Sequence, residues 1–209
     1  MTANAIEFWF SVGSSYSYLT VMRIDDVARR EQIDIRWRPF PVGNLMDEQN
    51  NIPFRGKPVK TAYMWRDIER RAAMYGLPVR VPAPYELTEY HEVNKIALLA
   101  DREGWCRDYV KETYRRWFQE GEEISRAPYL ERILRRVGQD PDRVFSAASS
   151  SANEQAYRAV TDEARRLNVF GSPTFVVAGE VFWGDDRLDD AIRWAKTGSL
   201  AGGTSARLP

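Results

Sequence analysis

The order of hydrophobic patterns along the chain is the feature that most constrains its fold. Near the start, Ile6–Val12 is rich in β-branched and aromatic residues over the length of a strand, and Tyr18–Arg30 has apolar residues at helical spacing. Ile33–Pro39 then alternates apolar and charged residues, which is typical of a strand. This order predicts a strand, a helix and a second strand, and the two strands of such a unit pair in parallel.

The rest of the chain changes from helical patterns back to strands. Pro41–Pro58 is rich in Pro, Gly and Asn and predicts a loop. Pro173–Val177 and Val181–Trp183 flank a turn that contains Gly179 and predict a hairpin. The predicted helices are Val59–Tyr75, Thr88–Glu103, Trp105–Gln119, Ala127–Val137, Pro141–Ser149, Ser151–Leu167 and Leu188–Lys196. In the helix Ser151–Leu167 we expect Ser151 to be the N-cap, because Glu154 follows it at capping-box spacing.

These patterns predict an α/β fold with a large all-helical insertion. We expect residues 1–44 and 168–200 to form one βαβ…ββα domain and residues 45–167 to form the insertion. Residues 201–209 are mostly small or polar and predict a flexible tail.

Composition excludes several classes of protein. The 30 Lys and Arg residues balance 30 Asp and Glu residues, so there is no net positive charge to attract nucleic acid. A single cysteine, Cys106, and a single histidine, His91, exclude an intramolecular disulfide, a CxxC redox pair and a Cys- or His-rich metal site. The chain has neither an apolar run of about 20 residues, which would span a membrane, nor the pattern of a secretory signal. We therefore expect a cytoplasmic protein with no membrane or nucleic-acid partner.

Three short segments could carry chemistry, and each has a simpler structural interpretation. Gly13–Tyr18 follows the first strand, where ligands of α/β sheets gather and a helix N-terminus favours an anion, but Ser14 or Ser15 could simply cap the helix. Val169–Thr174 contains a candidate cis proline, although most X–Pro bonds are trans. In Phe182–Leu188, an aspartate is most simply an N-cap.

The combination of segments resembles a known family. The chain resembles the thioredoxin-like fold with a helical insertion, but serines occupy the CxxC position of the DsbA oxidoreductases, so the thiol nucleophile of dithiol exchange is absent. From about Ile6 to Ala195 it instead resembles the 2-hydroxychromene-2-carboxylate isomerases, bacterial relatives of the kappa-class glutathione transferases. The motifs that carry this resemblance are SSYSY (14–18), NNIP (50–53), KTAYM (60–64), EGEEIS (120–125), VFGSPTFVV (169–177) and FWGDDRL (182–188).

The resemblance implies glutathione as cofactor and a set of site residues. Ser14 aligns with the family serine whose hydroxyl donates a hydrogen bond to the glutathione thiolate. A free thiol has a pKa of about 8.5, so only a small fraction of it is thiolate at neutral pH. Two residues differ from the family pattern: Ser15 replaces a usual proline and Ser11 a frequent aspartate. The implied glutathione-binding residues are Asn51, Lys60, Ser172, Pro173 (as a cis proline), Asp185 and Asp186.

The implied reaction interconverts 2-hydroxychromene-2-carboxylate and trans-o-hydroxybenzylidenepyruvate in aromatic catabolism. The expected partners are a small aromatic substrate and a second copy of the chain, as a homodimer. Such a substrate needs an apolar pocket. The candidate pocket aromatics are Trp9, Phe40, Tyr63, Tyr90 and Trp183, several of which must belong to the core.

Other functions stay open at this point. A kappa-like transferase would consume glutathione in a stable adduct with another electrophile, whereas the isomerase regenerates it. A non-catalytic thioredoxin-like module would bind a thiol or peptide without turnover. His91 is either a surface or helix-end histidine or a general base, and Cys106 is expected to be a partly buried small residue.

Overall fold

A computed structural model describes residues 5–201, and within them four strands form one sheet in the order β2-β1-β3-β4. β1 (Ile6–Phe10) pairs in parallel with β2 (Ile35–Pro39), as the strand–helix–strand pattern predicts. β3 (Thr174–Val177) is antiparallel to β1 and to β4 (Glu180–Trp183), which confirms the hairpin. The predicted tail lies outside the described residues except for Ala201.

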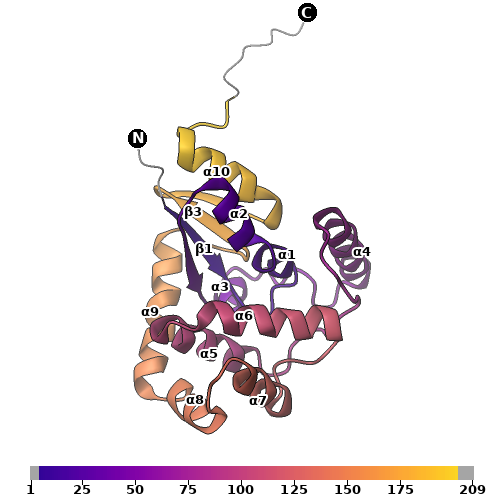
Figure 1. Cartoon of the computed structure of the whole chain (residues 1–209), viewed down its shortest axis with the longest axis vertical. Helices are drawn as coiled ribbons and strands as arrows, with labels where there is room; N and C mark the ends of the chain where they lie inside the picture. Colours follow the sequence, from indigo (N-terminus) through magenta and orange to yellow (C-terminus); the bar gives the residue numbers. More distant parts are fainter. Residues whose placement is uncertain (1–4, 202–209) are drawn as a thin grey trace, which may run out of the picture.

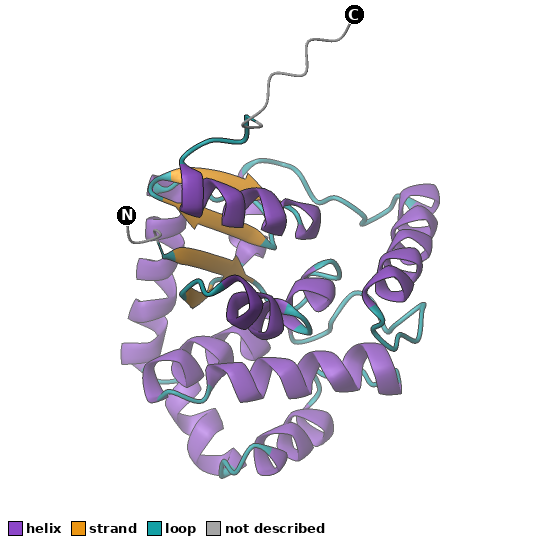
Figure 2. Cartoon of the chain, turned by 45° about the horizontal axis from the view of Figure 1, so that its top comes forward, coloured by secondary structure: helices purple, strands orange, loops and turns teal. Residues whose placement is uncertain are grey.

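Helices cover the sheet and extend far beyond it (Figure 1, Figure 2). Their order agrees with the predicted βαβ, helical segment and ββα. The helices are α1 (Ser17–Val21), α2 (Ile24–Glu31), α3 (Val42–Glu48), α4 (Pro58–Tyr75), α5 (Tyr90–Glu103), α6 (Cys106–Arg115), α7 (Ala127–Arg136), α8 (Pro141–Ala148), α9 (Ser151–Arg166) and α10 (Leu188–Thr197), with a π-helical turn at Arg116–Glu120 and a 3₁₀ turn at Asp185–Arg187.

Side chains of β1 are buried on both faces of the sheet. Successive side chains of a strand point to opposite faces. Phe8 and Phe10 therefore enter the core shared with α1, α2 and α10, and this core continues into α5–α8. Trp9 enters a second core with residues of α3, α5 and α9. A strand covered on both faces needs apolar residues at most positions, and in IEFWF only Glu7 is polar.

Three local predictions are wrong, and in the first two tertiary contacts override a local signal. The predicted helix Tyr18–Arg30 divides into α1 and α2, because the chain leaves the helix at Arg23, whose side chain reaches Asp185. The predicted loop Pro41–Pro58 contains α3, whose buried Leu45 packs in the core shared with α9. The N-cap of α9 is Ser150, whose Oγ accepts from the backbone N–H of Asn153.

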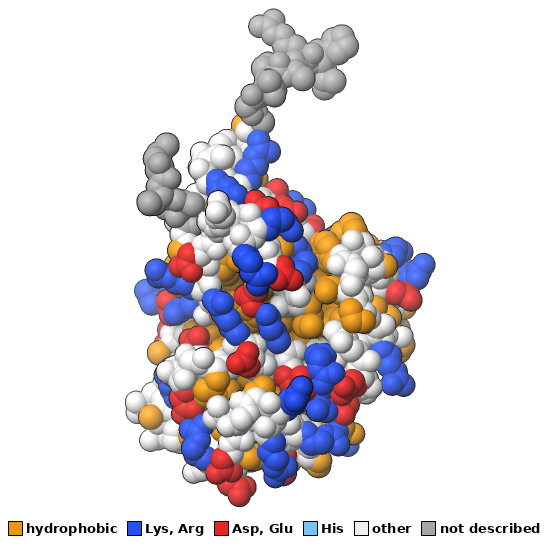
Figure 3. Space-filling view, in the orientation of Figure 1, with side chains coloured by type: hydrophobic (Ala, Val, Ile, Leu, Met, Phe, Trp, Pro, Cys, Tyr) orange, Lys and Arg blue, Asp and Glu red, His pale blue; other side chains and the backbone are white. Residues whose placement is uncertain are grey.

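Helix α4 stands apart from the other helices of the insertion, at the right of Figure 1. Its buried residues, Met64, Ile68 and Ala72, recur every four positions and form a single narrow stripe toward the rest of the molecule. On its other faces Val59, at 85% exposed, meets solvent, and hydrophobic side chains gather on the surface of this region in Figure 3. No helix within residues 5–201 is both long enough and apolar enough to cross a membrane.

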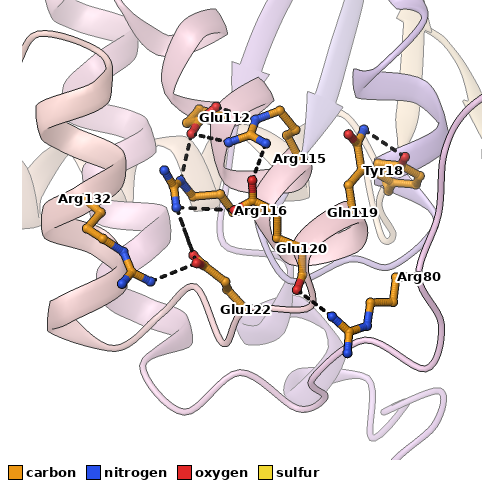
Figure 4. Close-up of polar contacts among 9 residues, drawn as sticks. All are labelled: Tyr18, Arg80, Glu112, Arg115, Arg116, Gln119, Glu120, Glu122 and Arg132. Carbon is orange, nitrogen blue, oxygen red and sulfur yellow. Dashed lines mark hydrogen bonds and ion pairs between the residues drawn. The ribbon is translucent and has the colours of Figure 1, made fainter.

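The end of α6 links the helical segment to the first helix. Arg116 binds Glu112 and Glu122 in a network of ion pairs around the π-helical turn (Figure 4). From the same turn, Gln119 donates to the Tyr18 hydroxyl, 3.3 Å away. The π-helical turn therefore connects the helical insertion to α1, the helix that begins just after Ser14.

Candidate active site

A cavity of about 850 Å³ opens where the sheet meets the helical insertion. The parallel strands β1 and β2 both end at this edge, and the hairpin strand β3 begins and β4 ends there. The segments after β1, before β3 and after β4 therefore meet, although about 160 residues separate the first from the other two. Six of the seven predicted site residues line this cavity: Ser14, Lys60, Ser172, Pro173, Asp185 and Asp186.

Ser14 lies in the turn between β1 and α1. Its Oγ donates to the carbonyl oxygen of Ser172 at 2.6 Å. The Ser172–Pro173 peptide bond is cis, as the resemblance implies. The Ser14 hydroxyl thus lies beside the backbone of the cis-proline turn at the wall of the cavity.

The side chain of Ser172 is turned into the protein. Its Oγ accepts from the backbone N–H of Ser11 at 2.9 Å and lies 2.8 Å from the Oγ of Ser17. Ser14 and Ser17 occupy the two positions of a CxxC motif, yet their surroundings differ, because Ser17 is fully buried and Ser14 is half-buried. Of this pair, Ser14 is therefore the residue that can meet a ligand.

Asn94 holds the loop after β1, and sequence reasoning missed it. Its side-chain Oδ1 accepts from the N–H of Val12 at 2.9 Å, and its Nδ2 donates to the carbonyl oxygens of Val12 and Tyr90, both at 2.8 Å. Asn94 lies among the buried residues of α5, and a buried amide must find hydrogen-bond partners. An asparagine on the apolar side of the predicted helix was the signal that could have revealed it.

A chain of hydrogen bonds extends from Asn94 to the cavity wall. The N–H of Gly43 donates to the Tyr90 hydroxyl at 3.0 Å, and this hydroxyl lies 2.6 Å from Ser11 Oγ, which donates to Asn94 Oδ1. Burial raises the pKa of Tyr90 to about 12, so the phenol is neutral. Tyr114 donates to the carbonyl oxygens of Ser11 and Ser14, each at 3.0 Å. We call the residues Ser11, Ser17, Tyr90, Asn94, Tyr114 and Ser172 the polar floor. Of these, Tyr90 and Ser172 line the cavity, and the other four make hydrogen bonds to residues of its lining.

The two neighbouring aspartates differ in their surroundings. Asp185 is 2% exposed, and its carboxylate accepts from Thr20 at 2.8 Å and from Arg23 and Tyr75 at 3.0 Å. Asp186 is exposed and pairs with Arg187 at the surface. Neither caps α10, whose N-cap is Arg187. Asp185 instead connects the turn after β4 to α1 and to the last residue of α4.

Of the two remaining predicted binding residues, Lys60 lies in the outer wall of the cavity and Asn51 does not. Lys60 is exposed on α4, with its Nζ 5.8 Å from the ring centre of Phe54. Tyr16 donates to Asp67 of α4 at 3.0 Å, and burial and this carboxylate raise the pKa of Tyr16. Asn51 is exposed and lies outside the cavity lining, one position before Ile52, which lines it.

The candidate pocket aromatics separate into core and cavity residues. Trp9 and Phe40 are fully buried in the core shared with α9, so they are not pocket residues. Tyr63, Tyr90 and Trp183 line the cavity. Trp183 is 54% exposed and packs against the backbone of Gly171, where a Cβ atom would lie 2.2 Å from the indole Nε1.

Fold and site together define a thioredoxin-like protein of the DsbA type with serines at the dithiol positions. The sequence model of the DSBA-like thioredoxin domain matches residues 5–192. The chain is 31% identical, over 89% of its length and 95% of the relative's, to a 2-hydroxychromene-2-carboxylate isomerase of Sphingobium xenophagum. The chain belongs to the DsbA-like thioredoxin family, in the enzyme branch that holds the 2-hydroxychromene-2-carboxylate isomerases and the kappa-class glutathione transferases.

Two further relatives place the chain in the same branch. A solved structure of a 2-hydroxychromene-2-carboxylate isomerase superposes with a TM-score of 0.78 at 26% identity, covering 89% of this chain and 91% of that one. The glutathione S-transferase kappa 1 of Caenorhabditis elegans is 24% identical over 88% of this chain and 87% of that protein.

Proposed function

We propose that the protein is a glutathione-dependent isomerase that interconverts 2-hydroxychromene-2-carboxylate and trans-o-hydroxybenzylidenepyruvate. The observation that carries this proposal is the half-buried Ser14 hydroxyl at the cavity wall, 2.6 Å from the Ser172 carbonyl oxygen of the cis-proline turn. The identity to curated isomerases supports the choice of reaction. A homodimer in the cytoplasm, and the division into residues 1–44 with 168–200 and an insertion of residues 45–167, belong to the same proposal.

Ser14 has a chemical role in this reaction. A hydroxyl has a single proton, so Ser14 cannot donate to Ser172 and to a thiolate at the same time. When its proton turns to a sulfur anion, the Ser172 carbonyl becomes free to accept from a peptide N–H of the ligand. A hydrogen bond to a charged group contributes about 1.5–3 kcal/mol, which lowers the pKa of the bound thiol by about 1–2 units.

The residues around the cavity fit a tripeptide with one ammonium and two carboxylate groups. Asp186 is the accessible carboxylate for the ammonium group, because the Asp185 oxygens are already occupied by Thr20, Arg23 and Tyr75. Asp185 would then position the turn that carries Asp186. Lys60 offers a positive charge to the glycyl carboxylate from the opposite wall. Asn51 stays a predicted contact to the same cofactor.

The aromatic side chains of the cavity would hold the substrate. Tyr63 and Trp183 are exposed and lie in the wall of a cavity of suitable size for a small aromatic acid and a cofactor. When bound, glutathione supplies a thiol sulfur that adds reversibly to the conjugated double bond of the substrate and so permits rotation about it. Ser14 acts at that sulfur, and the apolar walls exclude water from it.

The test is turnover of 2-hydroxychromene-2-carboxylate, followed by absorbance with and without glutathione while free thiol is titrated. We expect glutathione-dependent conversion with the thiol conserved, and a loss of kcat of about 10- to 100-fold in Ser14→Ala. Ser146→Ala, which removes an exposed serine from α8, is the matched control and should have no effect.

Other outcomes would favour the other functions. Consumption of the thiol in a stable product would indicate a kappa-like transferase, which the kappa relatives make the second candidate. Glutathione binding without turnover of either kind would indicate a binding module.

A further inference from the structure

His91, the single histidine of the chain, lines the same cavity as Ser14. It is exposed in the first turn of α5, and its Nδ1 lies 2.9 Å from the hydroxyl of Tyr157 on α9. Its ring also packs edge-on against Tyr90, with 5.4 Å between ring centres. The imidazole is therefore held by two aromatic neighbours on one side and meets the cavity on the other.

The ring of Tyr90 contacts both His91 and the turn that carries Ser14. A Cβ atom on Gly13 would lie 2.8 Å from the Tyr90 ring, so this ring rests on the backbone of the residue before Ser14. His91 packs on the same ring. Gly13 has a φ of +114°, a conformation that also favours glycine, so this close approach depends on the absence of a side chain.

The contact with Tyr157 is suited to proton transfer at the other ring nitrogen. Burial raises the pKa of Tyr157, so its phenol is neutral, and its oxygen can accept from Nδ1–H. In that tautomer Nε2 has a free lone pair and takes up a proton, while Nδ1 stays bound to the phenol. Tyr157 would thus orient the imidazole, as a second group orients the base in many catalytic pairs.

Charged and titratable groups lie on each of the elements packed around the imidazole. The charged or titratable groups around it are Asp47 on α3, Glu89 before α5, Tyr90, Glu92 and Lys95 on α5, and Glu154 and Tyr157 on α9. Lys95 and Glu154 neutralise each other in an ion pair of 2.8 Å. Burial raises the pKa of Tyr90 to about 12, so its phenol keeps its proton at neutral pH.

We propose that His91 transfers the proton that ring opening of a hydroxychromene-type substrate requires. The inference rests on the proposed isomerase function. Nε2 removes the proton from the hydroxyl on carbon 2, the bond between this carbon and the ring oxygen breaks, and a carbonyl forms at carbon 2. The ring oxygen leaves as a phenolate and takes the same proton from the imidazolium, so the step needs no other reactant.

The experiment compares wild type, His91→Asn and His91→Gln in the glutathione-dependent turnover of 2-hydroxychromene-2-carboxylate over a range of pH. We expect kcat to fall by about 100-fold in both variants, with loss of the acidic limb of the pH profile. Glutathione affinity from calorimetry and the ultraviolet absorbance of the bound thiolate should stay at the wild-type values. Added imidazole should restore part of the activity in His91→Ala.

A second variant tests the orienting contact. Tyr157→Phe keeps the ring but removes the hydroxyl at Nδ1, and we expect it to lower kcat by about 10-fold while KM is unchanged. Wild-type kcat and an unchanged pH profile in both His91→Asn and His91→Gln would overturn the role of His91 and leave the isomerase function intact. A wild-type protein that does not convert the substrate at all would overturn both.

Discussion

The polar floor of the cavity and its outer wall, the N-terminal half of α4, differ in how firmly their side chains are held. In the floor, Asn94 alone makes hydrogen bonds to Ser11 and Val12 after β1 and to Tyr90 in its own helix α5. In the wall, Lys60 and Tyr63 are exposed, and Tyr63 is 61% accessible. The comparison teaches that one cavity combines a side held by hydrogen bonds with a side of exposed, adaptable side chains. In the proposed reaction the first side would hold the reacting thiol and the second would select cofactor and substrate.

The attachment of α4 explains the adaptable side. Its C-terminal end is held where Tyr75 donates to Asp185 and Arg23 lies over the Tyr75 ring, 4.2 Å from its centre. Near its middle, Asp67 accepts from Tyr16. The N-terminal half, which carries Lys60 and Tyr63, lies beyond both contacts. Substitutions in the floor should therefore change stability, and substitutions of the exposed side chains in this half of α4 should change binding.

The largest effect is expected from Asn94→Ala. This substitution leaves the buried N–H and carbonyl groups of Val12 without their partners, which should lower the free energy of unfolding by about 3 kcal/mol. Urea denaturation measures the change. Asn51→Ala removes the same amide from an exposed position and should change stability by less than about 0.5 kcal/mol. Equal effects of the two substitutions would contradict the distinction between floor and surface.

The dependence of protein stability on alkaline pH should show the contribution of Tyr90 in the polar floor. Burial raises the pKa of its phenol from 10.0 to about 12 in the folded protein. Because the folded pKa is the higher one, Tyr90 stabilises the fold fully below pH 10 and loses this contribution as the pH rises through about 12. Tyr90→Phe should cost about 1–2 kcal/mol at neutral pH and lose less stability than the wild type across this alkaline range.

The control for this prediction lies in the outer wall. Tyr63→Phe removes an exposed hydroxyl and should leave both the neutral stability and its alkaline dependence unchanged. Urea unfolding at several pH values compares the three proteins. An alkaline profile of Tyr90→Phe that superposes on the wild-type profile would show that Tyr90 does not contribute in this way.

The smallest effect is expected from Lys60→Gln in the outer wall. Loss of an exposed charge should weaken glutathione binding about fivefold at low salt, with a smaller difference at high salt and no change in stability. Calorimetric titration measures the affinity. Lys57→Gln is the matched control, because Lys57 is also exposed at this end of α4 but lies outside the cavity lining. Equal weakening by both substitutions would indicate a general charge effect.

Much of the fold could be predicted from the sequence because its signals are local. The mostly apolar β1, the alternation in β2 and the turn at Gly179 each indicate a strand or a hairpin without knowledge of the rest of the chain. α3 and the break at Arg23 were missed because burial of Leu45 and the ion pair with Asp185 decide them. Those contacts join residues more than 100 positions apart.

The candidate site, like the fold, could be predicted from the sequence only in part. The resemblance to a known family, and not the patterns alone, selected Ser14, Ser172, Pro173 and the two aspartates. Asn94, Tyr90 and Tyr114 were missed as parts of the polar floor, because a single buried polar residue in a helix does not reveal its partner. Trp9 and Trp183 have the same side chain, and burial alone separates the core residue from the cavity residue.

The sequence by itself determined the order of the strands and of most helices, the parallel pairing of β1 with β2, the hairpin and the replacement of the dithiol by Ser14 and Ser17. Only the tertiary structure decided that Ser14 meets Ser172, that Asp185 is occupied while Asp186 is accessible, and that His91 lines the cavity. The physical reason is the distance along the chain over which each kind of interaction acts. Periodicity and turn chemistry act over a few residues, whereas burial and hydrogen-bond partners depend on packing between segments that the helical insertion separates.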